Sequence, residues 1–293
     1  MKWTRGTRND DVVDVRGRSA RGGGALKLGG GGLVAAVVVF AVARLFGVDL
    51  SGLLGGGDSS PTTTQNPGAT QPAPPTGSGG DPDAELVDYI RFVMKDIQDT
   101  FEGQYRAAGQ PYRRAKLLVF TSTVDTACGR SSAAIGPFYC PGDEQAYIDL
   151  SFYRDLKSRF GAPGDFAQAY VLAHEIGHHL QTLNGIAKET RRVGRDARSR
   201  NEASVRQELQ ADCFAGVWGH AAAARQLLDA GDLEEALTAA SAIGDDRLQR
   251  ESGREVDPET FTHGTSAQRI RWFRVGFQAG RLDACDTFSA QEL

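Results

Sequence analysis

The apolar positions along this 293-residue chain fall into regions of different character. Residues 1–27 are rich in Arg and Gly and show no apolar periodicity, whereas residues 28–48 form a nearly continuous apolar run. Residues 49–82 consist largely of Gly, Pro, Ser and Thr, and residues 83–293 alternate between periodic apolar segments and polar turns. These patterns predict a disordered basic tail, an apolar segment, a disordered linker and one globular domain, in that order.

The first part of the globular domain predicts one helix and two strands. Apolar residues recur every three or four positions over residues 83–104, which is the spacing of an amphipathic helix. Residues 116–123 and 145–152 are short apolar runs rich in strand-forming residues, and each predicts a strand. With several helices predicted after them, the fold class is α+β, mostly helical with a small sheet.

The second part of the domain predicts only helices. They cover residues 165–184, 201–228, 233–243 and a final stretch that Thr265 or Ser266 caps. Asp165 is the expected N-cap of the first of these helices, and Asp232 with Glu235 is the expected capping box of the third. Gly177 lies inside the first helix, where glycine costs about 1 kcal/mol relative to alanine, so we expect a close neighbour there.

The apolar run over residues 28–48 predicts a single-pass transmembrane signal anchor. Residues 28–43 carry no charge, Arg44 can snorkel to the interface, and residues 45–48 extend the apolar length. Basic residues lie mostly before the run, so the positive-inside rule places the N-terminus in the cytoplasm and the domain outside the cell membrane. A cleaved signal peptide is the alternative, but neither a short basic start nor a clear cleavage site is present. The lipid bilayer is therefore an expected partner.

Net charge argues against a nucleic-acid-binding protein. The chain carries 33 Lys and Arg against 37 Asp and Glu, for a formal net charge of −4. The basic excess lies in residues 1–54, so residues 83–293 are acidic as a whole. Nucleic-acid binding needs a clustered basic face, which this domain does not offer.

A five-residue motif in the first helix of the second part predicts a metal site. It reads His174-Glu175-Ile176-Gly177-His178, and two histidines four residues apart project from the same face of a helix. This H-E-x-x-H arrangement is typical of zinc peptidases, in which both histidines bind the metal and the glutamate acts as the base. The alternative is a polar helix face with two solvated histidines.

A catalytic zinc requires a third protein ligand. One known solution extends the motif to a third histidine, but Gln181 and Asn184 stand at its required Gly and His positions. The other solution is a glutamate on a later helix, followed four residues on by an aspartate. Glu208 and Asp212 match this spacing, so we expect Glu208 to bind zinc and Asp212 to accept a hydrogen bond from a motif histidine. The alternative is that both are surface acids.

The chain resembles the putative neutral zinc metallopeptidase family, a group of bacterial membrane-anchored proteins. The stretches that carry the resemblance are GPFYCP (136–141), YIDLSF (147–152), HEIGHHLQ (174–181), ELQADCFAGVW (208–218), IGDDRLQ (243–249) and FTHGTS (261–266). They span nearly all of the globular domain. The resemblance implies a zincin-like fold and a zinc-dependent hydrolase, with one Zn²⁺ per chain, that acts on peptides or proteins.

The expected mechanism assigns one role to each candidate. Glu175 would take a proton from the attacking water and pass it to the departing amine. The strand at residues 145–152 would be the sheet edge that pairs with an extended substrate. His263, with Tyr147 as second choice, would donate to the oxyanion, although a structural role at the start of the last helix is an equal alternative. His179 and His220 are expected to be surface or packing residues.

The four cysteines are expected to form disulfides if the domain lies outside the cytoplasm. Cys128 with Cys140 and Cys213 with Cys285 is one of three possible pairings. Zinc ligation by cysteine is the competing interpretation, but Cys213 would point away from the face of its helix that carries Glu208.

A function of another class is also open. It is a non-catalytic, membrane-tethered binding or scaffolding module that keeps zinc for stability. Loss of the motif glutamate would have favoured it, whereas Glu175 is present.

Overall fold

The computed structural model describes residues 1–17, 81–190 and 196–293. The expected anchor over residues 28–48 and nearly all of the expected linker over residues 49–82 lie outside these ranges. Among the described residues, no helix combines the length and apolar character that crossing a membrane requires. The α+β class expected for the domain is what the structure shows.

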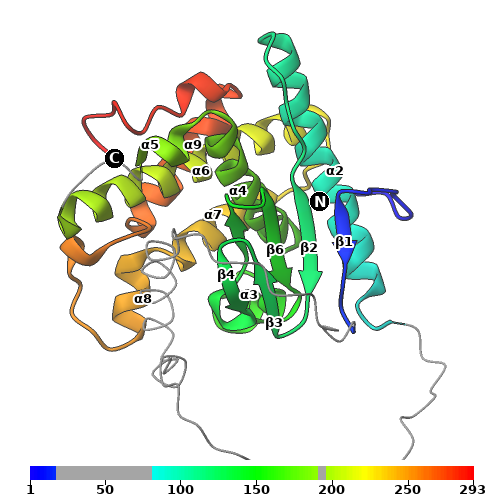
Figure 1. The fold of residues 1–293 in the computed structure, drawn as a ribbon, viewed down its shortest axis with the longest axis horizontal. Coiled ribbons are helices and arrows are strands. Elements are labelled where there is room, and N and C mark those ends of the chain that lie inside the picture. Colours follow the sequence, from blue (N-terminus) through cyan, green and yellow to red (C-terminus); the bar gives the residue numbers. More distant parts are fainter. Residues whose placement is uncertain (18–80, 191–195) are drawn as a thin grey trace, which may run out of the picture.

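A four-stranded sheet holds the strand order β1-β2-β6-β5 (Figure 1). Its strands are β1 (Val12–Asp14), β2 (Lys116–Phe120), β5 (Phe138–Cys140) and β6 (Gln145–Asp149). The first three in spatial order run parallel, and β5 is antiparallel to β6. The two predicted strands are thus present. The expectation that the second one forms the sheet edge is wrong, because β5 covers it there.

Both predicted strands end earlier than their apolar runs. After β2 the chain turns at Ser122, with φ 66°, into a separate hairpin of β3 (Thr123–Thr126) and β4 (Gly129–Ser132). After β6 it enters α3 (Ser151–Ser158) directly. Asp149 stabilises both turns, because its carboxylate accepts hydrogen bonds from the Ser122 and Ser151 backbone N–H groups.

Residues 1–17 are folded, so the expectation of a disordered tail over residues 1–27 is wrong for them. β1 pairs in parallel with β2, with Val12 opposite Leu117 (Figure 1, blue strand). Val12 is buried in the main hydrophobic core. A three-residue strand is too short to show a period of two, and its partner lies far along the chain, so the local pattern carries no sign of it.

Helices make up most of the rest of the domain. They are α2 (Ala84–Ala107), α4 (Asp165–Leu183), α5 (Ile186–Thr190), α6 (Ala197–Ala224), α7 (Asp232–Ala242), α8 (Asp245–Glu251) and α9 (Ser266–Ala279). The stripe expected on α2 is buried, with Ile90, Val93 and Phe101 fully inaccessible. α9 starts with the predicted cap. The Thr265 hydroxyl oxygen accepts the Gln268 N–H, and the Gln268 side-chain oxygen accepts the Thr265 N–H.

Glycines allow the long helices to approach closely. A Cβ at Gly276 of α9 would lie 1.9 Å from the Cys213 carbonyl oxygen of α6. A Cβ at Gly177 of α4 would lie 2.9 Å from the Ala211 Cα of α6. The close neighbour expected at Gly177 is therefore the backbone of α6, and α6 lies against both α4 and α9.

Two predicted helix caps are wrong, and the same acidic residues serve other contacts. Gly164, not Asp165, is the N-cap of α4, and Glu235 of α7 accepts the Phe166 N–H in its first turn. Asp232 is the first residue of α7, and no side chain caps that helix. Glu235 thus caps the neighbouring helix α4 rather than its own helix α7. The spacing of residues along the sequence does not reveal such a contact.

Both predicted disulfides are confirmed. Cys128, in the β3–β4 turn, bonds Cys140 at the end of β5. Cys213 of α6 bonds Cys285, 72 residues further on, next to the short helix η4 (Leu282–Ala284). With its sulfur in a disulfide, Cys213 is not a metal ligand.

Candidate metal centre

Three predicted ligands from two helices meet at one point. His174 and His178 lie on α4 and Glu208 lies on α6. The His174 Nε2 is 3.2 Å from Glu208 Oε2, and the His178 Nε2 is 3.5 Å from Glu208 Oε1. One ligand atom from each of the three residues lies within 4.8 Å of the other two. The structure thus groups two imidazole nitrogens and one carboxylate, all largely buried.

The close approach of α4 and α6 explains why these side chains meet. Residues 174 and 178 are one turn apart on α4, and residues 208 and 212 are one turn apart on α6, so each pair shares a helix face. Gly177 and Ala211 touch directly between the two pairs. A larger residue at either position would separate the helix axes and, with them, the two sets of side chains.

Asp212 orients His174 from behind. Its Oδ1 accepts a hydrogen bond from His174 Nδ1 at 2.8 Å and another from the Tyr170 hydroxyl. Arg269 of α9 donates to both carboxylate oxygens, through Nε at 2.8 Å and Nη2 at 2.9 Å. The Asp212 side chain is fully buried and that of Arg269 is 2% exposed. Four donors therefore surround one carboxylate, which holds the His174 ring with its Nε2 toward Glu208.

Charges in this cluster shift the proton equilibria of its members. Burial would lower the pKa of His174, but Asp212 and Glu208 raise it to about 10. Burial favours the neutral form of Asp212, yet Arg269 and His174 hold the pKa of Asp212 below its ordinary value. Glu208 is also kept anionic, because His178 and His174 lower its pKa despite its burial. Glu208 therefore offers an anionic oxygen between the two histidines.

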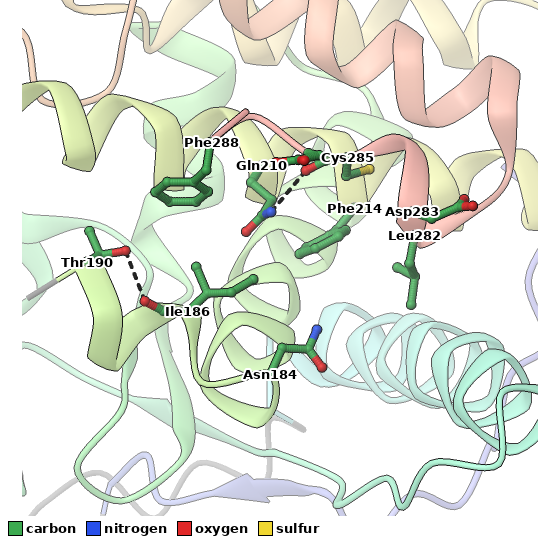
Figure 2. A pocket seen from close by; sticks show the side chains of 10 residues that line it. Asn184, Ile186, Thr190, Gln210, Phe214, Leu282, Asp283, Cys285 and Phe288 are labelled. Carbon is green, nitrogen blue, oxygen red and sulfur yellow. Dashed lines mark hydrogen bonds between the residues drawn. The ribbon is translucent and has the colours of Figure 1, made fainter. Parts of the chain in front are cut away.

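A chain of amides orients His178. Its Nδ1 donates to the Gln181 Oε1 at 2.9 Å, which assigns the imidazole N–H to that side. The Gln181 Nε2 donates to the Gln207 carbonyl and to the Gln210 Oε1. The Gln210 Nε2 in turn donates to the Cys285 carbonyl, the bond drawn in Figure 2. The segment fixed by the second disulfide thus supports the second histidine.

This donor set fits zinc. Ligand atoms about 2.1 Å from a tetrahedral ion lie about 3.4 Å apart, close to the two nitrogen–oxygen distances across Glu208. Both histidines turn Nδ1 to an acceptor and leave Nε2 for a metal, the usual arrangement around protein-bound zinc. Three protein ligands leave a fourth position for water or substrate, as in catalytic sites.

Glu175 lies beside the two histidines and is 7% exposed. Burial raises the pKa of its carboxyl group, and the nearby His178 and His174 counteract part of this effect. No donor in the described part of the chain hydrogen-bonds its carboxylate, in contrast to Asp212. A carboxylate without a fixed partner is free to accept a proton from water.

His263 lies in the loop before α9. The His263 Nδ1 lies 3.2 Å from the Asp245 Oδ1, so Asp245 contacts the Nδ1 side of the ring and not Nε2. Burial would lower the pKa of His263, but Asp245 and Glu208 raise it. Glu208 thus acts electrostatically on His263. The role of His263 as a donor stays a prediction.

Asp245 fixes the loop that carries His263. It is the first residue of α8, is 1% exposed, and its Oδ2 accepts the backbone N–H groups of Thr262, His263 and Gly264. Burial would raise the pKa of this carboxyl, but the His263 side chain and the backbone N–H groups of His263 and Thr262 hold it below its ordinary value. The loop is therefore pinned to the start of a helix rather than free.

The other candidates lie elsewhere. Tyr147 stacks on Phe138 in a second hydrophobic cluster, and its hydroxyl donates to Asp143, so it is no substitute for His263. His179 is fully buried between the Tyr139 hydroxyl and the Arg113 carbonyl, which is the packing role expected for it.

Sequence reasoning missed Arg269, Asp245 and Gln181. Arg269 is buried in α9 four residues before the buried Phe273, although arginine is a residue type expected at the surface. Asp245 lies in the IGDDRLQ stretch and Gln181 one turn after His178, but neither spacing identifies a partner. Their roles depend on residues from other helices.

A cavity of about 390 Å³ lies away from this centre. Gln210 lines it, and Gln210 is two residues from Glu208, about 200° around the helix. Ile186, Phe214 and Phe288 face it from α5, α6 and the C-terminal segment (Figure 2). It is largely apolar and shares no residue with the metal ligands.

Comparisons with known proteins agree with this geometry. The profile of the family described as "putative neutral zinc metallopeptidase" matches residues 1–288. The chain is 44% identical to the uncharacterized protein YpfJ of Escherichia coli K12, covering 98% of this chain and 99% of that one. It is also 44% identical to the uncharacterized protein Mb2605 of Mycobacterium bovis, over 62% of this chain and 65% of that one. No solved structure matches. The chain belongs to the putative neutral zinc metallopeptidase family.

Proposed function

We propose that this domain is a zinc-dependent endopeptidase. The observation that carries the proposal is the juxtaposition of His174, His178 and Glu208 with the unpartnered carboxylate of Glu175. A zinc ion bound there would supply a Lewis acid for the scissile carbonyl and lower the pKa of water toward neutrality. Histidine and glutamate would hold it, and Asp212 and Gln181 would orient the histidines.

Glu175 acts as the proton carrier in this proposal. Its carboxylate takes a proton from the attacking water and gives it to the departing amine, the two halves of general base and general acid catalysis. Burial raises the pKa of this carboxyl, which favours retention of the proton until the amine leaves. A buried carboxylate held by several donors, such as Asp212, would be a far weaker base.

His263 is the proposed donor to the developing oxyanion. Two observations support this role: Asp245 holds the Nδ1 side of the ring, and the Glu208 carboxylate acts on it electrostatically. Asp245 and Glu208 favour the protonated imidazole, whose Nε2–H would be a charged donor. A preorganised donor of this kind stabilises the transition state without moving during the reaction.

An extended substrate is proposed to pair with β5. This strand is the sheet edge on the side of α4, and its Tyr139 hydroxyl contacts His179 of that helix. Exposed strand edges bind peptides through main-chain hydrogen bonds. The Cys128–Cys140 disulfide anchors the end of β5 and would keep this edge in place.

The two disulfides favour an extracytoplasmic domain. Every cysteine of the chain is paired, and structural disulfides persist in oxidising compartments. We propose this location for the domain. The bilayer as a partner stays a prediction, because the apolar run lies outside the described residues.

The test compares wild type with Glu175→Gln and with Glu255→Gln, a matched change at an exposed glutamate. Cleavage of unfolded proteins and of a broad peptide library is measured by mass spectrometry, together with zinc content. We expect zinc in all three proteins and a loss of cleavage of at least about a hundredfold in Glu175→Gln alone. Undiminished cleavage by Glu175→Gln would refute the mechanism. Bound zinc with no cleavage by wild type would favour the non-catalytic module.

A further inference from the structure

The chain's own N-terminus lies in an acidic pocket. The Met1 α-amino group is 2.6 Å and 2.8 Å from the two carboxylate oxygens of Asp165. Asp232 is 3.4 Å away and Asp229 is 3.7 Å away. Met1 is 8% exposed, and the amino group itself is inaccessible. Three carboxylates therefore surround one ammonium group at the first residue of α4, the helix that carries His174 and His178.

The geometry is that of a site for a cation. The start of a helix carries partial positive charge, which disfavours a nearby ammonium group. The carboxylates overcome both this effect and burial, which alone would lower the pKa of the Met1 amine; hydrogen bonding and attraction from Asp165 and Asp232 raise it instead. The Tyr89 hydroxyl donates to the Asp165 carbonyl and closes the pocket on one side.

The residues after Met1 are bound along their length. The Lys2 N–H donates to the Leu227 carbonyl, and the Trp3 ring meets the Tyr89 ring edge-on with centroids 5.5 Å apart. The Asn9 side chain donates to the Arg91 carbonyl of α2. β1 then joins the sheet.

The two ends of the segment between residues 17 and 81 meet. The guanidinium of Arg16 is 2.5 Å from the Asp81 carboxylate and 3.1 Å from that of Asp83. The Arg16 side chain is 14% exposed, and Asp14 and Asp81 raise the pKa of its guanidinium despite partial burial. The chain thus leaves the domain and returns to it at the same place.

We propose that Asp165, Asp229 and Asp232 form a binding site for a free α-amino group, that of Met1. In the folded protein, the N-terminus and the metal domain then lie on the same side of any membrane. This proposal replaces the single crossing expected from the sequence, and it is independent of the proposed peptidase activity.

A blocked N-terminus tests the site. Three residues, Gly-Ser-Gly, are placed between a new initiator Met and Met1 in the full-length protein, which moves the amino group away from the pocket. This extension is combined with Asp165→Asn in a double-mutant cycle, and Asp125→Asn, at an exposed position, is the matched control. We expect the extension to lower the melting temperature by about 5 °C in wild type and in Asp125→Asn, and by much less in Asp165→Asn. An unchanged melting temperature, or additive effects with Asp165→Asn, would overturn the proposal.

Labelling tests the shared side independently. Arg8→Cys and Arg254→Cys each add one thiol at an exposed position, and the native cysteines are all in disulfides. Cells with permeabilised outer layers are treated with a membrane-impermeant maleimide before or after lysis. We expect both thiols to react in the same condition. Reaction of one thiol before lysis and of the other only after lysis would overturn the proposal.

Discussion

Gly177 of α4 touches Ala211 of α6 so closely that a Cβ on the glycine would lie 2.9 Å from the Ala211 Cα and 3.0 Å from its carbonyl oxygen. This contact lies between the two histidines of α4 and the two acids of α6. It therefore sets the distance across which Glu208 reaches His174 and His178.

Gly177→Ala is expected to weaken zinc binding and to destabilise the fold. The added methyl group has to push two helix backbones apart, and overpacking of this kind costs about 1–3 kcal/mol. The control is Gly103→Ala in α2, where a Cβ would meet nothing within 4 Å. There, removal of a helix glycine should be neutral or stabilising by up to about 1 kcal/mol. Zinc affinity from chelator competition and urea unfolding measure both effects; equal behaviour of the two variants would contradict the role of the contact.

Gln181→Leu is expected to lower zinc affinity at least about tenfold, because the outer hydrogen bond to His178 is lost while the volume is kept. Gln168→Leu on the same helix is the matched change. Chelator competition should separate the two variants clearly. If zinc affinity is the same in both, the chain of amides does not support His178.

Arg269→Met is expected to be among the most damaging substitutions outside the ligands. It leaves the fully buried Asp212 carboxylate without its charged partner, and a broken buried pair costs about 3–5 kcal/mol. Arg271→Met, on the same helix but half exposed, should cost less than about 0.5 kcal/mol. Denaturant unfolding of the two variants gives the comparison. A small loss at position 269 would show that Asp212 is held mainly by His174 and Tyr170.

The N-terminal pocket predicts a loss of stability at alkaline pH. The pKa of the Met1 amine is raised above its ordinary 8.0, so its contribution is fully present below pH 8 and disappears as the pH rises through the higher folded-state value. The groups that face it are the carboxyl groups of Asp165, Asp229, Asp232 and Glu235 and the hydroxyl of Tyr89. Burial raises the pKa of Tyr89 well above 10.

The measurement is the melting temperature from about pH 7 to about pH 10 for wild type and for the N-terminally extended protein. Other groups titrate equally in both proteins, so the difference between the two curves reports the amine. We expect the curves to converge at high pH. A constant difference across the range would show that the extension acts through sterics rather than charge.

The metal ligands could be predicted because the residues of each pair lie within one helical turn of each other in the sequence. His174 and His178 share one helix, Glu208 and Asp212 share another, and helical spacing alone places each pair on a face. α2 was predictable for the same reason, since its buried residues follow the helical period. The α6–α9 contact at Gly216 and Gly276 depends on the tertiary arrangement of those helices.

What the sequence did not reveal lies between segments distant in the chain. β1 and β5 have three residues each, too few for a period, and each is stabilised by a neighbour in the sheet. Asp165 and Glu235 have the residue types and positions of helix caps. Their carboxylates instead accept hydrogen bonds from the Met1 amine and the Phe166 N–H, respectively. The partners of Arg269 and Asp245 likewise come from other elements.

The position of β1 in the sheet has a consequence for biosynthesis. Residues 12–14 leave the ribosome well before their partner β2, which begins at residue 116, and the parallel β6 follows at residue 145. Parallel pairing between such distant segments is slow, because a long loop has to close before any contact forms. During synthesis, β1 therefore stays unpaired until about a hundred further residues have been made, and its pairing closes the longest loop in this sheet.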